Sequence, residues 1–88
     1  MASRTVDVLN KRGLHARASA KFVTLAASQS AAVEVEKDGS TVCGTSIMGL
    51  MMLGAACGDR ITISAEGDGA EDAVAALAEL VEAKFGEE

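Results

Sequence analysis

The stretch VEVEKDGSTVC, residues 33–43, is the centre of the topology that this sequence predicts. Valine and glutamate alternate over residues 33–36, which is the period of a half-buried strand. Asp38-Gly39 follows, the strongest short signal for a β-hairpin, and Thr41-Val42-Cys43 has the pattern of the returning strand. The sequence therefore predicts an antiparallel strand pair in the middle of the chain.

A strand is also predicted on each side of this hairpin, and a helix follows the first of them. Arg4–Leu9 and Arg60–Ser64 alternate polar and apolar residues, as strands with one buried face do. A helix is predicted from about Ala16. Its inner face consists of Ala18, Phe22, Leu25 and Ala26.

Two further helices are predicted from their ends and their periodicity. Ser46 is the predicted N-cap of a short apolar helix over residues 47–53. Asp68, with Glu71 three residues further on, is the predicted N-cap of the last helix, which ends at Gly86. The inner face of this last helix consists of Ala70, Ala73, Val74, Leu77, Val81 and Phe85.

The predicted order is therefore strand, helix, strand, strand, helix, strand, helix. Each strand has one apolar face, so helices should cover one face of the sheet while the other face meets water. Two interleaved strand–helix–strand units give the strand order 1-4-2-3. We expect a single α+β domain over residues 1–88, an open-faced β-sandwich in which a four-stranded antiparallel sheet carries three helices on one face. Another split arrangement of the same elements is the alternative.

The composition fits one small domain and limits the classes of function. Of the 88 residues, 49% are hydrophobic, two are Phe, none is Trp or Tyr, and the formal net charge is −5. A nucleic-acid binder on such a sheet needs stacking aromatic residues and a basic surface, so we expect no nucleic-acid partner. No apolar run is long enough to span a bilayer and none follows the first residues as a leader would, so we expect a cytoplasmic protein without membrane insertion.

The two cysteines are predicted to be reduced, partly buried thiols. Cys43 and Cys57 form no Cys-x-x-Cys pair, and the chain has only one histidine to join them as a ligand. We therefore expect neither a metal site nor a cofactor.

Positive charge is concentrated near the start of the chain. Residues 1–30 carry five basic side chains and one acidic side chain, whereas residues 31–88 carry three basic and twelve acidic ones. The basic side chains that bracket the histidine are Lys11, Arg12, Arg17 and Lys21. Such a local field on an acidic protein indicates an anionic ligand or an acidic docking partner, the alternative being that these side chains are simply solvated.

The sequence GLHAR, residues 13–17, places the single histidine at the start of the first helix. Gly13 permits a tight turn, so that His15 falls at the N-cap or at the position before it. The backbone N–H groups of Ala16 and Arg17, with the Arg17 guanidinium, would form an anion site suited to phosphate. An imidazole is a good nucleophile near neutral pH, so His15 is a candidate phosphoryl acceptor. The alternative is that a lone histidine is a surface or structural residue.

A hydrolase is disfavoured at this site. No carboxylate lies near His15 in the sequence, no second histidine exists, and no Gly-x-Ser-x-Gly motif occurs. A protein that only carries a group needs fewer catalytic side chains of its own, because its partner enzymes supply the others. Phosphoryl transfer also depends mainly on position and charge. Arg12 is a candidate accessory cation beside the phosphate.

Two motifs, GLHAR at residues 13–17 and SIMGLMMLG at residues 46–54, resemble signatures of the HPr family, the histidine-containing phosphocarriers of the bacterial phosphotransferase system. The resemblance implies a stoichiometric phosphoryl carrier, not an enzyme. His15 would accept on Nδ1 a phosphoryl group that enzyme I derives from phosphoenolpyruvate, Arg17 would close on it, and a histidine of an enzyme IIA protein would receive it. The resemblance also implies sugar uptake or a nitrogen-related regulatory branch, with Ser46 as a regulatory serine for HPr kinase/phosphorylase. We expect a monomer.

Two positions depart from the family pattern. Ala18 stands where the family commonly has proline, which leaves the first helical turn less fixed. Thr45 stands where a basic residue often precedes the regulatory serine, which weakens the case for serine regulation. A plain N-cap is the alternative interpretation of Ser46. The alternative function is an HPr-like regulatory protein that acts by protein binding under Ser46 control, although such members lack the histidine that this chain has at position 15.

The second motif contains more apolar residues than two helical turns can bury. Leu50 and Leu53 are expected in the core, so the others should be exposed. Methionine adapts to varied surfaces, which suits a carrier that docks successively with different enzymes. The predicted docking residues are Ala16, Ala20, Ile47, Met48 and Met51.

Overall fold

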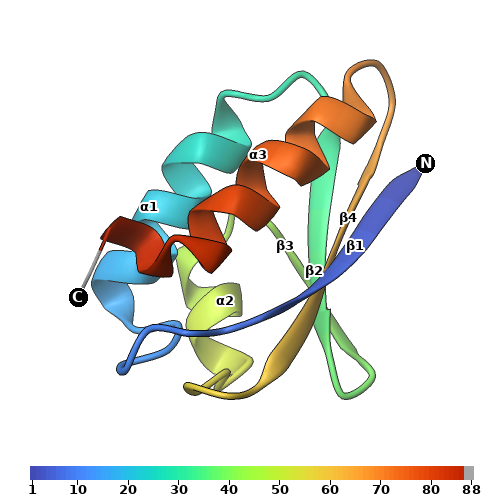
Figure 1. The fold of residues 1–88 in the computed structure, drawn as a ribbon. Coiled ribbons are helices and arrows are strands. Elements are labelled where there is room, and N and C mark those ends of the chain that lie inside the picture. Colours follow the sequence, from blue (N-terminus) through green and yellow to red (C-terminus); the bar gives the residue numbers. More distant parts are fainter. Residues whose placement is uncertain (87–88) are drawn as a thin grey trace.

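The computed structural model of the chain describes residues 1–86, so the end of the predicted domain, Glu87-Glu88, lies outside the described residues. The elements follow one another in the predicted order (Figure 1). They are β1 (Ala2–Asp7), α1 (Ala16–Ala27), β2 (Ala32–Lys37), β3 (Ser40–Cys43), α2 (Ile47–Met52), β4 (Arg60–Glu66), α3 (Ala70–Glu82) and the 3-10 turn η1 (Lys84–Gly86).

The sheet has four strands in the order β1-β4-β2-β3, and every neighbouring pair is antiparallel. The last strand in sequence therefore lies between the first and the second, as two interleaved units require. The three helices lie on one side of the sheet (Figure 1). This confirms the predicted open-faced α+β sandwich and its strand order over the alternative split arrangement.

The hairpin between β2 and β3 has the predicted turn. Asp38 and Gly39 both have left-handed backbone conformations, with φ of 52° and 86°. Two consecutive positive φ values match the twist of a two-residue hairpin loop. The turn fixes the register in which Lys37 faces Ser40 and Val35 faces Val42.

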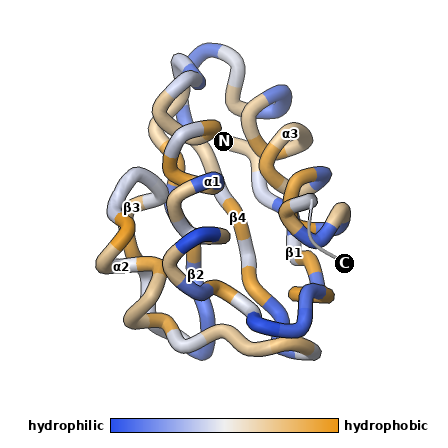
Figure 2. Tube along the Cα trace, turned by 90° about the vertical axis from the view of Figure 1, so that its left-hand side faces the viewer, coloured by the Kyte–Doolittle hydropathy of each residue, from blue (hydrophilic) through white to orange (hydrophobic). Residues whose placement is uncertain are grey.

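The core lies between the sheet and the helices, and both aromatic side chains, Phe22 and Phe85, are fully buried in it. Hydrophobic and hydrophilic stretches alternate along the helices and strands (Figure 2). All six residues predicted for the inner face of α3 are buried, and so is Leu50 of α2. On the other face of the sheet, polar groups face water, as in the hydrogen bond of 3.0 Å between the hydroxyls of Thr5 and Thr62.

The last helix differs from its prediction at both ends. Gly69, not Asp68, is the N-cap, and no side chain caps this helix. Gly69 has a φ of 79°, and its carbonyl accepts the first helical hydrogen bond, from Ala73 N–H. The left-handed glycine thus moves the start of α3 past Asp68. The helix ends at Glu82 and not at Gly86, because η1 intervenes, with positive φ at its central residue.

The loop before α1 lies directly on the segment before β4. Leu14 N–H donates to the carbonyl of Ala55 at 2.9 Å. Gly13 has a φ of +64°, and a Cβ there would overlap the Ala55 carbonyl oxygen and come within 2.8 Å of the Cα of Ala56. Only glycine permits this approach of two backbones.

We predict that Gly13→Ala destabilises the fold more than Gly54→Ala. Both glycines have nearly the same backbone conformation, with φ of +64° and +65°, but a Cβ at Gly54 has no neighbour within 4 Å. Gly54→Ala should lower the free energy of unfolding by about 1 kcal/mol, from the left-handed backbone alone. Gly13→Ala should lower it by about 3 kcal/mol, because the clash adds to the strain. Urea unfolding of both variants measures the difference, and equal losses would contradict the packing argument.

Candidate functional site

His15 is the N-cap of α1, as predicted. Its backbone is extended, with φ of −77° and ψ of −179°, and its carbonyl accepts a hydrogen bond from Ser19 N–H at 2.9 Å. Its ring nitrogen Nδ1 accepts a hydrogen bond from Arg17 N–H at 3.2 Å. The lone pair of Nδ1 therefore faces the positive end of the helix, and the neutral ring carries its proton on Nε2.

The loop before His15 is held by buried polar side chains that sequence reasoning missed. Asn10 is fully buried, and its Nδ2 donates to the Gly13 carbonyl at 2.8 Å. Ser19, also fully buried, donates from Oγ to the Leu14 carbonyl at 3.2 Å. Asparagine is a common turn residue, so the pattern Asn-Lys-Arg-Gly was a usable signal for Asn10. The sequence contained no comparable signal for Ser19, because a serine in the first turn of a helix can make several other hydrogen bonds.

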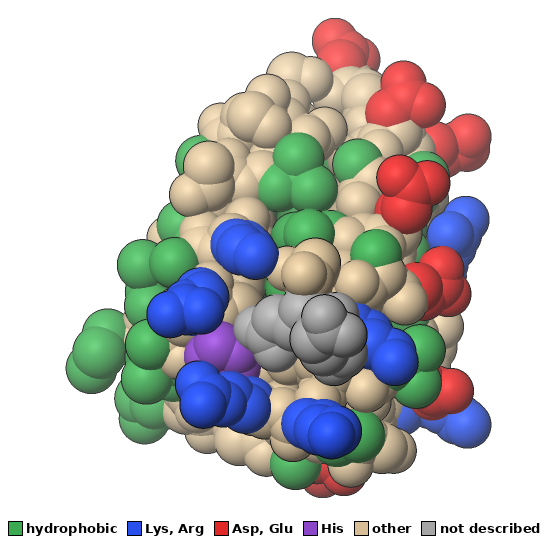
Figure 3. Space-filling view, turned by 60° about the vertical axis from the view of Figure 1, so that its left-hand side comes forward, with side chains coloured by type: hydrophobic (Ala, Val, Ile, Leu, Met, Phe, Trp, Pro, Cys, Tyr) green, Lys and Arg blue, Asp and Glu red, His purple; other side chains and the backbone are tan. Residues whose placement is uncertain are grey.

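Basic side chains surround the histidine at the surface. Figure 3 shows Lys and Arg side chains on several sides of it, whereas the acidic side chains in this view lie mainly toward the opposite edge. Arg12 and Arg17 are exposed, and the histidine between them in sequence is half-buried. Lys21 is exposed as well, and its Nζ donates to the Phe85 carbonyl at 2.7 Å. The predicted concentration of positive charge thus forms one region around His15.

Ser46 is the N-cap of α2, as predicted. Its Oγ accepts a hydrogen bond from Gly49 N–H at 3.0 Å, and α2 then runs over Ile47–Met52. Leu53 is half-buried against the core, and Gly54 follows with a φ of 65°. The serine itself is partly exposed, at the start of a helix that packs against α1.

The apolar side chains of α2 that do not enter the core are exposed. The exposed fractions are 41% for Ile47, 70% for Met48, 42% for Met51 and 80% for Met52. Of the two predicted α1 residues, Ala16 is exposed and Ala20 is half-buried. In Figure 3 a group of hydrophobic side chains borders the histidine. We call Ala16, Ala20, Ile47, Met48 and Met51, together with Met52, the apolar patch.

Met52 was expected to be exposed but was left out of the predicted docking residues, although the signal was available. With Leu50 and Leu53 turned inward, helical geometry places the residue two positions after Leu50 on the outer side of α2. It is 80% exposed and lies four residues after Met48, so both side chains project from the same face of α2.

The cysteines are exposed, which corrects the prediction that they are partly buried. Cys43 points from the edge strand β3, and its Sγ lies 3.1 Å from the Thr45 hydroxyl. Hydrogen bonds from the side chain and backbone of Thr45 lower the pKa of the Cys43 thiol, against smaller opposing effects of burial and of the Glu34 charge. Cys57 lies in the turn before β4, and its Sγ donates to the Leu9 carbonyl at 3.6 Å. Both thiols are free.

Residues 1–86 contain neither a cluster of metal-ligating side chains nor a membrane-spanning helix. In this part of the chain, no three His, Cys, Asp or Glu side chains come together as metal ligands would. None of the helices described there is long and apolar enough to cross a membrane.

Comparison with known proteins identifies the class to which this fold and histidine loop belong. The family model described as the phosphorylation site of the HPr component of the phosphotransferase system matches residues 2–83. The HPr of Neisseria meningitidis serogroup B is 45% identical over 87 residues, which are 99% of this chain and 98% of that protein. The phosphocarrier protein NPr of Shewanella violacea is 38% identical over 84 residues, 96% of this chain and 92% of that protein.

A solved structure agrees with the sequence comparison. The crystal structure of HPr from Thermoanaerobacter tengcongensis matches with a TM-score of 0.95 and 49% identity, covering 100% of this chain and 99% of that one. A second crystal structure from that organism, described as an HPr dimer, matches with a TM-score of 0.78 and 48% identity over 99% of this chain and 100% of that one. The chain belongs to the HPr family, the phosphocarrier proteins of the phosphotransferase system.

Proposed function

We propose that His15 accepts a phosphoryl group on Nδ1 from phosphorylated enzyme I, which is charged by phosphoenolpyruvate, and passes it to a histidine of an enzyme IIA protein. The observation that carries this proposal is the hydrogen bond from Arg17 N–H to Nδ1 at 3.2 Å. It aims the nucleophilic lone pair at the end of α1, where a dianion is stabilised.

In the proposed step, a bond forms between Nδ1 and phosphorus while the bond to the enzyme I donor breaks. The Nδ1 lone pair is then used by phosphorus, so the backbone N–H groups of Ala16 and Arg17 donate to phosphate oxygens instead. A charge-assisted hydrogen bond is worth about 1.5–3 kcal/mol, and the helix end adds about 0.3–1 kcal/mol. The flat, forked guanidinium of Arg17 can bind two phosphate oxygens at once, and Arg12 adds a second exposed cation.

The apolar patch is the proposed docking surface for both enzyme I and enzyme IIA. Exposed methionines can repack against different partners, and an apolar area beside a basic rim is typical of a transient interface. Ala16 of the patch directly follows His15, and α2, which carries the methionines, packs against α1, so a partner seated on the patch would bring its own reactive group close to Nδ1. The carrier would act as a monomer, because this surface must be open to each enzyme in turn.

Ser46 is proposed as a regulatory phosphorylation site for HPr kinase/phosphorylase. Its hydroxyl lies at the N-terminus of α2 and next to the exposed Ile47. Because a phosphate at that position meets backbone N–H groups, it would preserve α2 and act through its charge. A regulatory protein controlled by Ser46 alone is disfavoured, since this chain has a histidine at position 15, at the N-terminus of α1.

Incubation with enzyme I and labelled phosphoenolpyruvate tests the transfer proposal. We expect wild type to gain an acid-labile, base-stable phosphate, and His15→Ala to gain none. Arg17→Ala should reduce the transfer rate by about a hundredfold, because a charge donor to the phosphoryl group is lost. Arg17→Lys should restore it only in part, because one ammonium replaces the fork.

Arg4→Ala, at an exposed arginine of β1, is the matched control for loss of positive charge and should transfer at the wild-type rate. A label that survives mild acid would contradict phosphorylation on histidine. Equal rates for wild type and Arg17→Ala would contradict the role of the arginine.

We predict that Met48→Asp raises the KM of phosphorylation by enzyme I and of transfer to enzyme IIA by roughly tenfold each. A carboxylate in the apolar patch must be desolvated on docking with either partner. Ala75→Asp, which adds the same charge at an exposed position of α3, is the control and should leave both KM values unchanged. An effect on one partner alone would contradict a shared docking surface.

Ser46→Asp and Ser46→Asn distinguish the effect of a negative charge at position 46 from the effect of the N-cap. Both side chains cap a helix well, so both variants should keep α2, which circular dichroism and unfolding can check. Ser46→Asp should slow phosphorylation by enzyme I by roughly tenfold at low salt, since the added charge opposes an acidic partner face. Ser46→Asn should transfer at the wild-type rate. If Asp and Asn behave alike, Ser46 is a cap and not a charge switch.

A further inference from the structure

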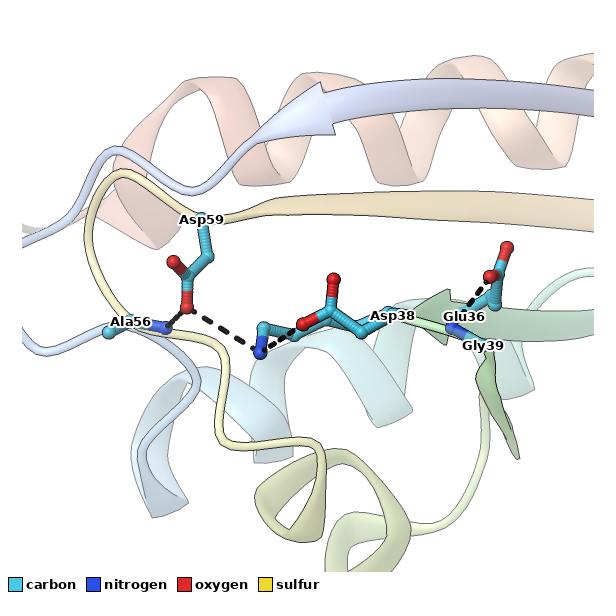
Figure 4. A network of polar contacts seen from close by, with 6 residues as sticks. Glu36, Asp38, Gly39, Ala56 and Asp59 are labelled. Atoms are coloured by element: carbon cyan, nitrogen blue, oxygen red, sulfur yellow. Dashed lines mark hydrogen bonds and ion pairs between the residues drawn. The ribbon is translucent and has the colours of Figure 1, made fainter.

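We propose that Asp59 is a positioning residue for phosphoryl transfer, because its carboxylate fixes the turn on which the histidine loop rests. This inference rests on the proposed function of His15. Figure 4 shows the Asp59 carboxylate facing the Ala56 N–H. The Lys37 ammonium lies near the same carboxylate oxygen.

The first step is the turn itself, residues 56–59. Asp59 N–H donates to the Ala56 carbonyl at 2.9 Å, which closes the turn through the backbone. The Asp59 carboxylate oxygen Oδ2 accepts a hydrogen bond from Ala56 N–H, also at 2.9 Å, which closes it a second time through the side chain. Both polar groups of the Ala56 backbone are thereby bound to one residue.

The second step leads from this turn to the histidine loop. Val8 N–H donates to the Asp59 carbonyl and Gly58 N–H donates to the Val8 carbonyl, both at 2.8 Å. The Ala55 carbonyl, one residue before the turn, accepts from Leu14 N–H at 2.9 Å. Leu14 directly precedes the N-cap of α1, so a displacement of Ala55 would move the backbone that sets the direction of the His15 ring.

The third step is the orientation of the carboxylate. Lys37, at the end of β2, has a side chain only 17% exposed, and its Nζ lies 3.7 Å from Asp59 Oδ2 and 3.2 Å from Asp38 Oδ2. The hydrogen bond to Asp38 and the charges of both aspartates raise the pKa of Lys37, against its partial desolvation. An ion pair of 3.7 Å near the surface contributes little by itself. The hydrogen bond from Ala56 N–H is therefore the main contact that orients the Asp59 carboxylate, and the Lys37 ammonium adds a weaker attraction to the same oxygen.

Three variants test this assignment in phosphorylation by enzyme I. Asp59→Ala removes the acceptor for Ala56 N–H and should lower kcat by about three- to tenfold at unchanged KM. Asp59→Asn keeps a carbonyl oxygen that can accept this hydrogen bond and should restore most of kcat. Asp38→Asn is the matched control, because it removes the other carboxylate near Lys37 and leaves the turn at residues 56–59 unchanged. Asparagine is also compatible with the left-handed φ of 52° at position 38. This variant should transfer at the wild-type rate.

The ratio of the exchange rates of two amides gives a measurement that does not depend on global stability. In Asp59→Ala the Leu14 amide should exchange faster relative to the Gly44 amide, which bonds the Val33 carbonyl at 2.8 Å. A loss of global stability would instead accelerate both amides alike. If Asp59→Ala does not fold, Asp59→Glu replaces it, because the longer side chain keeps the charge and displaces the acceptor. The same rise in the exchange ratio is then expected.

A wild-type kcat together with a wild-type exchange ratio in Asp59→Ala, or in Asp59→Glu used in its place, would overturn the proposal. An equal fall of kcat in Asp59→Asn and Asp38→Asn would also overturn it, because the charge around Lys37, and not the turn, would then control transfer. Failure of the wild-type protein to accept phosphate would refute the proposed function itself, and the exchange ratio would still report on the turn.

Discussion

The hydrogen bond from Leu14 N–H to the Ala55 carbonyl is the contact on which the histidine site depends. It joins the loop after β1 to the segment before β4, and these two strands are neighbours in the sheet. The strand order 1-4-2-3 thus brings together two segments that are about forty residues apart in sequence. Gly13 makes the contact possible, since any Cβ at its position would overlap the Ala55 carbonyl.

The site around His15 combines a backbone held by hydrogen bonds with a surface of exposed side chains. Behind His15 the backbone is held by hydrogen bonds from buried Asn10 and Ser19, which define its direction. In front of it lie exposed arginines and methionines with many rotamers. The proposed transfer needs both, because the proposed nucleophile must be aligned within narrow limits while the proposed docking surface meets different proteins.

The sequence predicted most of the fold and the location of the histidine, but not what holds the histidine loop. Strand alternation, the Asp38-Gly39 turn and the cap at Ser46 are local signals, and the structure agrees with the turn and the cap. The strands also lie where alternation predicts them, except that β1 (Ala2–Asp7) begins and ends two residues before the predicted Arg4–Leu9. The predicted start of α3 at Asp68 was wrong. A left-handed Gly69 and an aspartate N-cap are both compatible with the local sequence, and only the tertiary context selects between them. The Asp59 turn itself is local, but its connection to the histidine loop, from Leu14 N–H to the Ala55 carbonyl, joins segments distant in sequence, and no local pattern encodes that contact.

The charges at the helix starts point to a common physical basis for the two proposed phosphorylation sites. The first turn of α3 contains Glu71 and Asp72, whose carboxylates already compensate the positive end of that helix. The first turns of α1 and α2, both within the described residues, contain no acidic residue. Carboxylates there would compete with an incoming phosphate for the same N–H groups and repel it. The helix N-termini next to His15 and Ser46 therefore keep their positive potential. The proposed phosphate acceptor is an imidazole at one of them and a hydroxyl at the other.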